Sequence, residues 1–329
     1  MSTGPLTYLV TGGAGFVGSH LVEALLAQDC RVLVVDDLST GRMENLASAV
    51  GHPHFTFALA SVTDERMMDM VTAKVDVVIH LAAVVGVGLV IEHPVRVIET
   101  NVAGTRAVLK AAVRHRPRVL IASSSEVYGK GVRMPAEEED ELLLGPTSRS
   151  RWCYAASKMV DEFLALAYQQ EYGLEVVPFR LFNTVGPRQS GRYGMVIPRF
   201  MQQALKGEPI TVYGDGTQTR CFCDVQDVVR ALIGLSTHPD AAGRVYNVGG
   251  TEEVSMNELA ERVRMVAGSD SPIVRLPYAD VYPHGYEDIQ RRVPDTRRLR
   301  SLLGWEPRLS LDATLPRVRD YLQSVLTEL

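Results

Sequence analysis

The chain has 329 residues, of which 46% are hydrophobic, and its formal net charge is −5. This length and hydrophobic content are enough to bury a large core, which we expect to be divided between two subdomains. The mildly acidic balance argues against proteins that bind nucleic acid or anionic membranes through a basic surface. We therefore expect neither a nucleic-acid partner nor a membrane partner.

The apolar stretch at 6–27 has the hydrophobicity of a signal peptide, but it carries His20, Glu23 and four glycines. We interpret it instead as a strand, a turn and a helix of a folded domain. No run of about 18 unbroken apolar residues follows, so no membrane-spanning helix is predicted. The four cysteines form no CxxC pair, so we predict free thiols in a reducing cytoplasm and no metal site.

The first half of the chain alternates β-branched runs with helical patterns. The strands are apolar at nearly every position, which is typical of a parallel sheet covered by helices on both faces. We therefore expect a doubly wound α/β domain of the Rossmann type over residues 1–182. Its strands are predicted at 7–12, 31–37, 54–61, 75–83, 118–125 and 174–181, and its helices at 16–28, 94–115 and 153–173.

From Asn183 onward, glycine and proline become frequent and the strands become shorter. We expect a smaller α/β lobe built from residues 183–221 and 251–329, while 222–250 returns to the first sheet. The acidic run at 136–141 is expected to form a solvated loop. The later strands are predicted at 209–214, 244–250 and 272–277, and the later helices at 196–207 and 256–268.

A glycine-rich turn, TGGAGFVGSHL, follows the first strand directly and opens the first helix. Gly12, Gly15 and Gly18 permit a tight turn and a close backbone approach, so a pyrophosphate can sit on the helix N-terminus. Asp36 ends the next strand, where a carboxylate accepts hydrogen bonds from the adenosine ribose. Because it would also repel a 2′-phosphate, the pattern predicts NAD as the cofactor in preference to NADP.

A second motif, YxxxK, stands at the start of a predicted helix and follows the segment SSSEVYG at 123–129. Tyr154 and Lys158 are about one helical turn apart and project from the same face. A nearby ammonium favours the phenolate, so we expect the pKa of Tyr154 to be lowered and the tyrosine to act as a base at neutral pH.

Taken together, these segments resemble the extended short-chain dehydrogenase/reductase family in its nucleotide-sugar branch, over almost the whole chain. The motifs that carry the resemblance are TGGAGFVGSHL, VDDLSTGR, HLAA, NVAGT, SSSEVYG, YAASK, RLFNTVGPR, VYGDGTQTR and LGWEP. The resemblance implies hydride transfer from the sugar C4 to NAD, with Tyr154 taking the C4 hydroxyl proton. It also implies that Lys158 holds the nicotinamide ribose and that Ser124 hydrogen-bonds the reacting oxygen.

Further cofactor contacts are implied by the same resemblance. One departure is the pair Ser61-Val62, where many members of the branch place an aspartate against the adenine. The complete set of implied cofactor residues is Gly12, Gly15, Phe16, Val17, Gly18, Asp36, Leu81, Ala82, Ala83, Asn101, Tyr154 and Lys158.

The smaller lobe supplies the expected substrate contacts. Asn183 and Arg220 resemble the residues that clamp the diphosphate in this branch, and an arginine suits that task because its fork forms charge-assisted bonds in fixed geometry. Tyr213 is expected against the base, and Arg192 is a further candidate for substrate contact. Alternatively, Asn183 caps a turn, Arg220 belongs to a surface ion pair and Arg192 faces solvent.

The loop SSSEVYG distinguishes reactions that share the first oxidation. Dehydratases of the branch place Asp-Glu where this chain has Ser125 and Glu126, whereas UDP-glucuronate decarboxylases have a hydroxyl residue followed by Ser-Glu-Val-Tyr-Gly. The segment 285–307 also resembles bacterial decarboxylases, in which an arginine at the place of Arg292 acts as an acid or an electrostatic partner. Alternatively, Arg292 only binds diphosphate and Glu126 only supports its own turn.

The resemblance therefore predicts an NAD-dependent UDP-glucuronic acid decarboxylase that yields UDP-4-keto-xylose, UDP-xylose or both. Its predicted catalytic residues are Ser124, Ser125, Glu126, Tyr154, Lys158 and Arg292. Two alternatives are a UDP-hexose or UDP-hexuronate 4-epimerase and a non-catalytic NAD-sensing protein. The resemblance also implies a cytoplasmic homodimer in which helices 94–115 and 153–171 pair into a four-helix bundle.

Overall fold

The computed structural model describes residues 4–131, 133–191, 194–281 and 288–327. A central sheet of seven strands has the order β11-β6-β5-β4-β1-β2-β3, and every neighbouring pair in it is parallel. The predicted doubly wound α/β fold is thus confirmed. The strands are β1 (Thr7–Thr11), β2 (Arg31–Asp36), β3 (Phe55–Leu59), β4 (Val77–His80), β5 (Arg118–Ser124), β6 (Val176–Leu181) and β11 (Tyr246–Val248).

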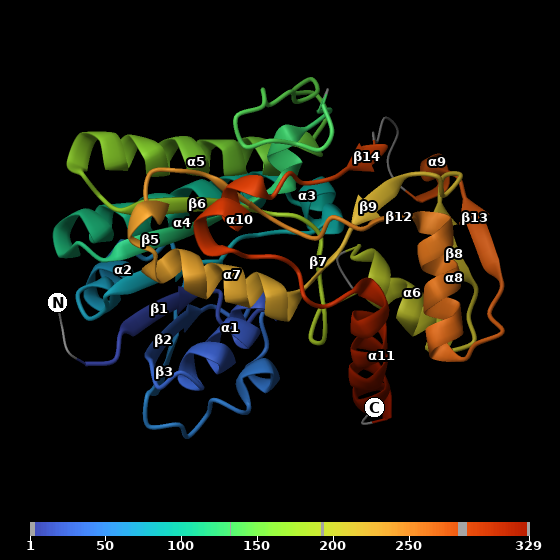
Figure 1. The fold of residues 1–329 in the computed structure, drawn as a ribbon, viewed down its shortest axis with the longest axis horizontal. Coiled ribbons are helices and arrows are strands. Elements are labelled where there is room, and N and C mark those ends of the chain that lie inside the picture. The colour runs from blue at the N-terminus through green and yellow to red at the C-terminus, as the bar shows by residue number, and fades with distance from the viewer. Residues whose placement is uncertain (1–3, 132, 192–193, 282–287, 328–329) are drawn as a thin grey trace.

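Helices cover both faces of this sheet because its strands are apolar on both sides (Figure 1). One core packs the sheet against α1 (Phe16–Leu26), α7 (Val225–Thr237) and α10 (Arg297–Leu303). The other core packs it against α2 (Glu65–Thr72), α4 (Pro94–His115) and α5 (Trp152–Tyr172). Shorter helical segments in the same part of the chain are η1 (Met43–Leu46), α3 (Val87–Glu92), η2 (Ser125–Tyr128) and η3 (Pro239–Ala241).

A second lobe lies at one end of the sheet and has its own apolar core (Figure 1). Two small sheets belong to it, with β8 (Ile210–Tyr213) beside β13 (Ile273–Leu276), and β9 (Thr219–Cys221) between β12 (Glu253–Ser255) and β14 (Arg291–Arg292). A third small sheet, β7 (Thr184–Val185) beside β10 (Cys223–Asp224), joins the two parts, because Val185 packs in the core of the lobe and Cys223 in a core of the main sheet. The helices of the lobe are α6 (Val196–Leu205), α8 (Met256–Ala267), α9 (Tyr278–Val281) and α11 (Leu311–Thr327).

The acidic run at 136–141 differs from the prediction of a solvated loop. Glu138 is only 8% exposed, and its Oε1 accepts a hydrogen bond of 3.0 Å from the Asn247 backbone N–H. Its backbone carbonyl accepts a further bond of 3.0 Å from Arg180. The prediction was wrong here because strands remote in sequence supply the donors that allow this carboxylate to be buried.

The strand order reverses between β1 and β4, and crevices at such a reversal hold ligands beyond the carboxyl ends of the strands. Three predicted site residues directly follow the ends of β1, β4 and β5, namely Gly12, Leu81 and Ser125. A ligand site is therefore expected at this edge of the sheet. Over the described part of the chain, none of the helices has the length and apolar character needed to cross a membrane.

Candidate active site

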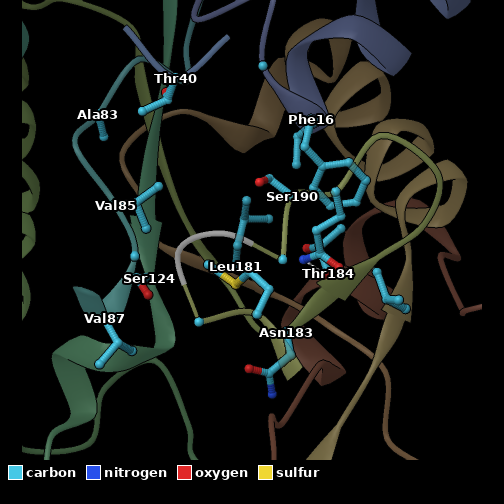
Figure 2. Close-up of a pocket in the computed structure, with 18 of the residues that line it drawn as sticks. Phe16, Thr40, Ala83, Val85, Val87, Ser124, Leu181, Asn183, Thr184 and Ser190 are labelled. Carbon is cyan, nitrogen blue, oxygen red and sulfur yellow. Dashed lines mark hydrogen bonds between the residues drawn. The ribbon is translucent and has the colours of Figure 1, made fainter. Parts of the chain in front are cut away.

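A cavity of about 800 Å³ lies between the sheet edge and the second lobe. Figure 2 shows Ala83, Val85 and Ser124 along one side of it, with Phe16 and Asn183 among the residues of the opposite side. The structure brings most of the predicted site residues together here. The cavity is lined by Gly12, Gly15, Phe16, Val17, Gly18, Asp36, Leu81, Ala82, Ala83, Ser124, Ser125, Glu126, Tyr154, Lys158, Asn183, Tyr213, Arg220 and Arg292.

Of the predicted residues that the structure describes, Asn101 does not appear in this lining. Asn101 is 1% exposed, and its Oδ1 accepts a hydrogen bond of 2.8 Å from the Val84 N–H while its Nδ2 donates to Ser157 Oγ at 3.1 Å. It therefore holds the loop after β4 in place from behind the cavity wall. Arg192 lies outside the described residues.

The glycine turn leaves room for a phosphate at the start of α1. Gly12 adopts φ +71°, a left-handed conformation that glycine takes without strain, and its N–H donates to the Val35 carbonyl at 2.9 Å. A Cβ at Gly18 would stand 2.2 Å from the Gly12 carbonyl oxygen. The helix can thus approach the turn only because both positions lack side chains, and its open N-terminus fits the pyrophosphate of a dinucleotide.

Asp36 is fixed by backbone donors at the end of β2. Its two carboxylate oxygens accept hydrogen bonds from the N–H groups of Ala14 at 2.9 Å and Leu38 at 2.8 Å. Burial raises the pKa of Asp36, and these two bonds act in the opposite direction. Because each carboxylate oxygen has a second lone pair, the group can still accept a bond from a ribose hydroxyl in the cavity.

The Tyr154–Lys158 pair lies in the wall of the cavity. Burial raises the pKa of Tyr154, although the Lys158 charge and a hydrogen bond with Ser124 oppose this effect. The predicted lowering of this pKa was therefore wrong for the structure as it stands, because loss of water outweighs the lysine. Lys158 is 2% exposed, and its Nζ donates to Asp161 Oδ2 at 2.9 Å, so part of its charge is already compensated.

Glu126 lies between two arginines that come from distant segments. Its Oε1 is 2.6 Å from Arg292 Nη2, and its Oε2 is 3.0 Å from Arg151 Nη2. Burial would raise the pKa of Glu126, but the two guanidinium groups outweigh it and hold the pKa below its ordinary value. Arg292 also donates to Ser125 Oγ at 3.4 Å. The result is a partly buried ionic triad of two cations and one anion beside Tyr154.

Arg151 has no assigned role in the sequence interpretation. It stands directly before α5 and three residues before Tyr154, so helical spacing alone places the two side chains on neighbouring parts of one face. This spacing could have indicated that Arg151 lies near the site. It could not indicate that Arg151 pairs with Glu126, because the two residues are 25 positions apart in the chain.

A further arginine, Arg220, meets Arg292 where β9 and β14 pair, because the two residues are partners in the register. Burial lowers the pKa of Arg220, and the neighbouring Arg292 charge adds to this effect, while Asp288 at 2.9 Å opposes it. Two adjacent guanidinium groups in a cavity wall suit an anionic ligand such as a diphosphate.

The other two predicted substrate residues are held by neighbours. The Arg199 guanidinium lies 3.8 Å from the centre of the Tyr213 ring. Asn183 donates from Nδ2 to the Cys221 carbonyl at 3.1 Å, and its own carbonyl accepts from the Cys223 N–H at 3.0 Å. Asn183 therefore joins β6 to the second lobe and also faces the cavity.

Comparison with known proteins identifies relatives of this arrangement. Residues 8–249 match the NAD dependent epimerase/dehydratase family. The UDP-N-acetyl-alpha-D-glucosaminuronate decarboxylase of Bacillus cytotoxicus is 40% identical over 96% of this chain and 98% of its own length. UDP-glucuronic acid decarboxylase 1 of Arabidopsis thaliana is 38% identical over 98% of this chain and 71% of its own length. The solved structure of the UDP-glucose 4-epimerase of Thermotoga maritima with UDP-glucose has a TM-score of 0.87 at 31% identity, covering 98% of this chain and 100% of that one.

Proposed function

The chain belongs to the NAD dependent epimerase/dehydratase family, and from this premise we propose that it is an NAD-dependent UDP-glucuronic acid decarboxylase. The observation that carries the proposal is the ionised Glu126 held between Arg151 and Arg292 next to Tyr154. Relatives named as uronate decarboxylases match the chain over almost its whole length, which supports the same conclusion.

The cofactor is NAD, as the family implies. The turn at Gly12 and Gly18 would hold its pyrophosphate, Asp36 its adenosine ribose, and Lys158 its nicotinamide ribose. The remaining contacts are proposed for Gly15, Phe16, Val17, Leu81, Ala82 and Ala83, with Asn101 supporting the loop that carries the last three. When bound, NAD supplies a hydride acceptor for oxidation at C4 of the sugar.

The first role of the protein is to take a proton from the sugar. Tyr154 accepts the proton of the C4 hydroxyl, and Ser124, which lines the same cavity, orients the reacting oxygen. Lys158 stabilises the phenolate that this step requires. Lys158 is buried in the wall of the cavity, where electrostatic interactions are stronger than in bulk water.

The second role is to assist the loss of CO2. Once C4 is a ketone, the C6 carboxylate is β to a carbonyl, so the C5–C6 bond breaks and its electron pair moves into an enolate centred on C5, C4 and O4. C5 then takes up a proton from the water that reaches the cavity, which restores the ketone. Arg292, which lines the cavity, supplies positive charge for this step.

Glu126 and Ser125 fix the position of this arginine. Because Glu126 is ionised and shared between two guanidinium groups, it contributes a fixed negative charge and does not act as a proton donor. The negative charge of Glu126 also repels the C6 carboxylate of the substrate, and this repulsion favours release of CO2. In a 4-epimerase nothing next to C5 requires this triad.

The diphosphate and the base are proposed to bind in the second lobe, through Arg220, Asn183 and Tyr213, with Arg192 as a further contact. We divide the chain accordingly into an NAD-binding domain over residues 1–182, joined by the returning segment 222–250, and a nucleotide-sugar-binding lobe over 183–221 and 251–329. Pairing of β11 with β6 supports this division.

A homodimer in the cytoplasm completes the proposal. Helices α4 and α5 expose Val95, Ile98, Val160 and Phe163, whose exposed fractions are 65%, 44%, 43% and 69%. Side chains of this size on two adjacent helices favour burial against a second copy. The four thiols are free in the structure, which agrees with a reducing compartment.

The test is a mass-resolved assay of the purified chain with NAD and UDP-glucuronic acid, and separately with UDP-N-acetylglucosaminuronic acid. These two sugars differ at C2 and share the C4 hydroxyl and the C6 carboxylate on which the mechanism depends. Loss of CO2 supports the proposal, and the oxidation state of the product distinguishes UDP-4-keto-xylose from UDP-xylose. An isomer of unchanged mass would instead identify a 4-epimerase.

A further inference from the structure

Asp161 forms a buried ion pair with the lysine of the YxxxK motif, and the mechanism above gives it no role. Its Oδ2 accepts a bond of 2.9 Å from Lys158 Nζ, and the two side chains are 0% and 2% exposed. Both residues lie on α5, three positions apart, so the helix itself fixes their contact.

Burying such a pair removes two charges from water, at a cost that well-packed apolar residues of similar size would avoid. A carboxylate at this place therefore does not improve stability in any obvious way. Its effect is on Lys158, because an ammonium has three donors and Asp161 fixes one of them. Two donors remain for a ribose in the cavity.

The other groups that face Lys158 do not compete for it. Glu162, on the same helix, accepts two bonds from Arg180, at 2.9 and 2.7 Å, and another from Ser123. His80, on β4, is bonded through Nδ1 to Thr11 at 2.8 Å. Burial and the Lys158 charge lower the pKa of His80 to about 3, so it is neutral.

Thr105 of α4 and Glu126 of η2 complete these surroundings. Burial raises the pKa of Asp161 and Thr105 acts in the opposite direction, while the charge of Glu126 acts to raise the pKa of Tyr154. Since Glu126 is engaged by Arg151 and Arg292, Asp161 is the carboxylate that directly pairs with Lys158 among the described residues.

From this geometry we infer that Asp161 is a positioning residue that fixes Lys158 and offsets part of its charge, so that Tyr154 retains its proton more strongly than a Tyr-Lys pair alone would allow. The inference rests on the proposed role of Tyr154 as the base. Burial and the Asp161 charge both act to raise the pKa of Tyr154, in agreement with it.

The test is a spectrophotometric pH titration of tyrosinate. Subtracting the curve of the Asp161→Asn/Tyr154→Phe double variant from that of Asp161→Asn gives the titration of Tyr154 in the absence of the Asp161 charge. Subtracting the curve of Tyr154→Phe from that of the unaltered chain gives the titration of Tyr154 in its presence. We expect Tyr154 to titrate about one pH unit lower without the Asp161 charge, because Lys158 remains protonated near Glu162 and its charge is no longer offset. Asp161→Ser, which leaves space for water, serves if the asparagine variant folds poorly.

Glu171→Gln is the matched control, since Glu171 is an exposed acid on the same helix. Asp161→Glu should restore the original titration. A Tyr154 titration that stays in place or moves upward in both Asp161 variants would overturn the inference. The titration needs no substrate, so its outcome is independent of the sugar that the enzyme uses. Where turnover is observed, the acid limb of the rate profile should move with the titration.

Discussion

Replacement of Glu126 by glutamine tests the ionic triad that distinguishes this site. Glutamine has the same shape but no charge, so Arg151 and Arg292 would remain as neighbouring buried cations with 10% and 7% of their side chains exposed. Removing one partner of a buried pair costs about 3–5 kcal/mol. Because this site opens into the cavity and water can reach it, we expect a loss of about 2–3 kcal/mol and a Tm lower by about 5 °C.

The pH dependence of this loss follows from the direction of the pKa shift. The pKa of Glu126 is lowered in the folded chain from an ordinary value of 4.5, so its stabilisation is fully present above that value and disappears as the pH falls through the folded pKa. The Tm difference between the two proteins should accordingly be constant near neutral pH and shrink in acid. Circular dichroism melts in a series of buffers would measure it.

The Glu126→Gln protein should also release CO2 much more slowly. Loss of a preorganised electrostatic group typically slows a reaction by about 10²–10³-fold, and we expect a decrease of this size in CO2 release with NAD binding unchanged. Glu139→Gln is the control, because Glu139 pairs with Arg298 at the surface with 82% of its side chain exposed. A folded Glu126→Gln protein that decarboxylates at the original rate would refute the role given to the triad.

Three other substitutions or treatments test separate parts of the structure. Gly18→Ala should abolish NAD binding, measured by calorimetry, because its Cβ would collide with the turn, whereas Gly88→Ala, with nothing within 4 Å, should bind normally. Phe163→Glu should shift the chain from dimer to monomer in light scattering, and Met265→Glu, which is equally exposed at 69%, should not. Burial raises the thiol pKa of Cys223, so brief alkylation of the native protein near neutral pH should leave it unmodified until the chain is unfolded; rapid labelling would contradict its placement in the core.

Local spacing in the sequence was sufficient to predict the fold class and which glycine-turn residues line the cavity. Gly12, Gly15 and Gly18 follow one strand and open one helix, and Asp36 ends the next strand, so their relative positions depend on a single βαβ unit. The same holds for Tyr154 and Lys158, which share one turn of a helix. Such motifs are readable because neighbouring residues in a regular element have known geometry.

Only the tertiary structure determined which charged groups pair in the site and in which direction their pKa values shift. Arg151 and Arg292 reach Glu126 from the start of α5 and from β14, and Glu138 is buried because Asn247 and Arg180 supply donors from two other strands. The pKa of Tyr154 was predicted in the wrong direction from its spacing to Lys158 alone. Whether a group is charged depends on the water it loses and on every charge around it, and both are set by segments that meet only when the chain folds.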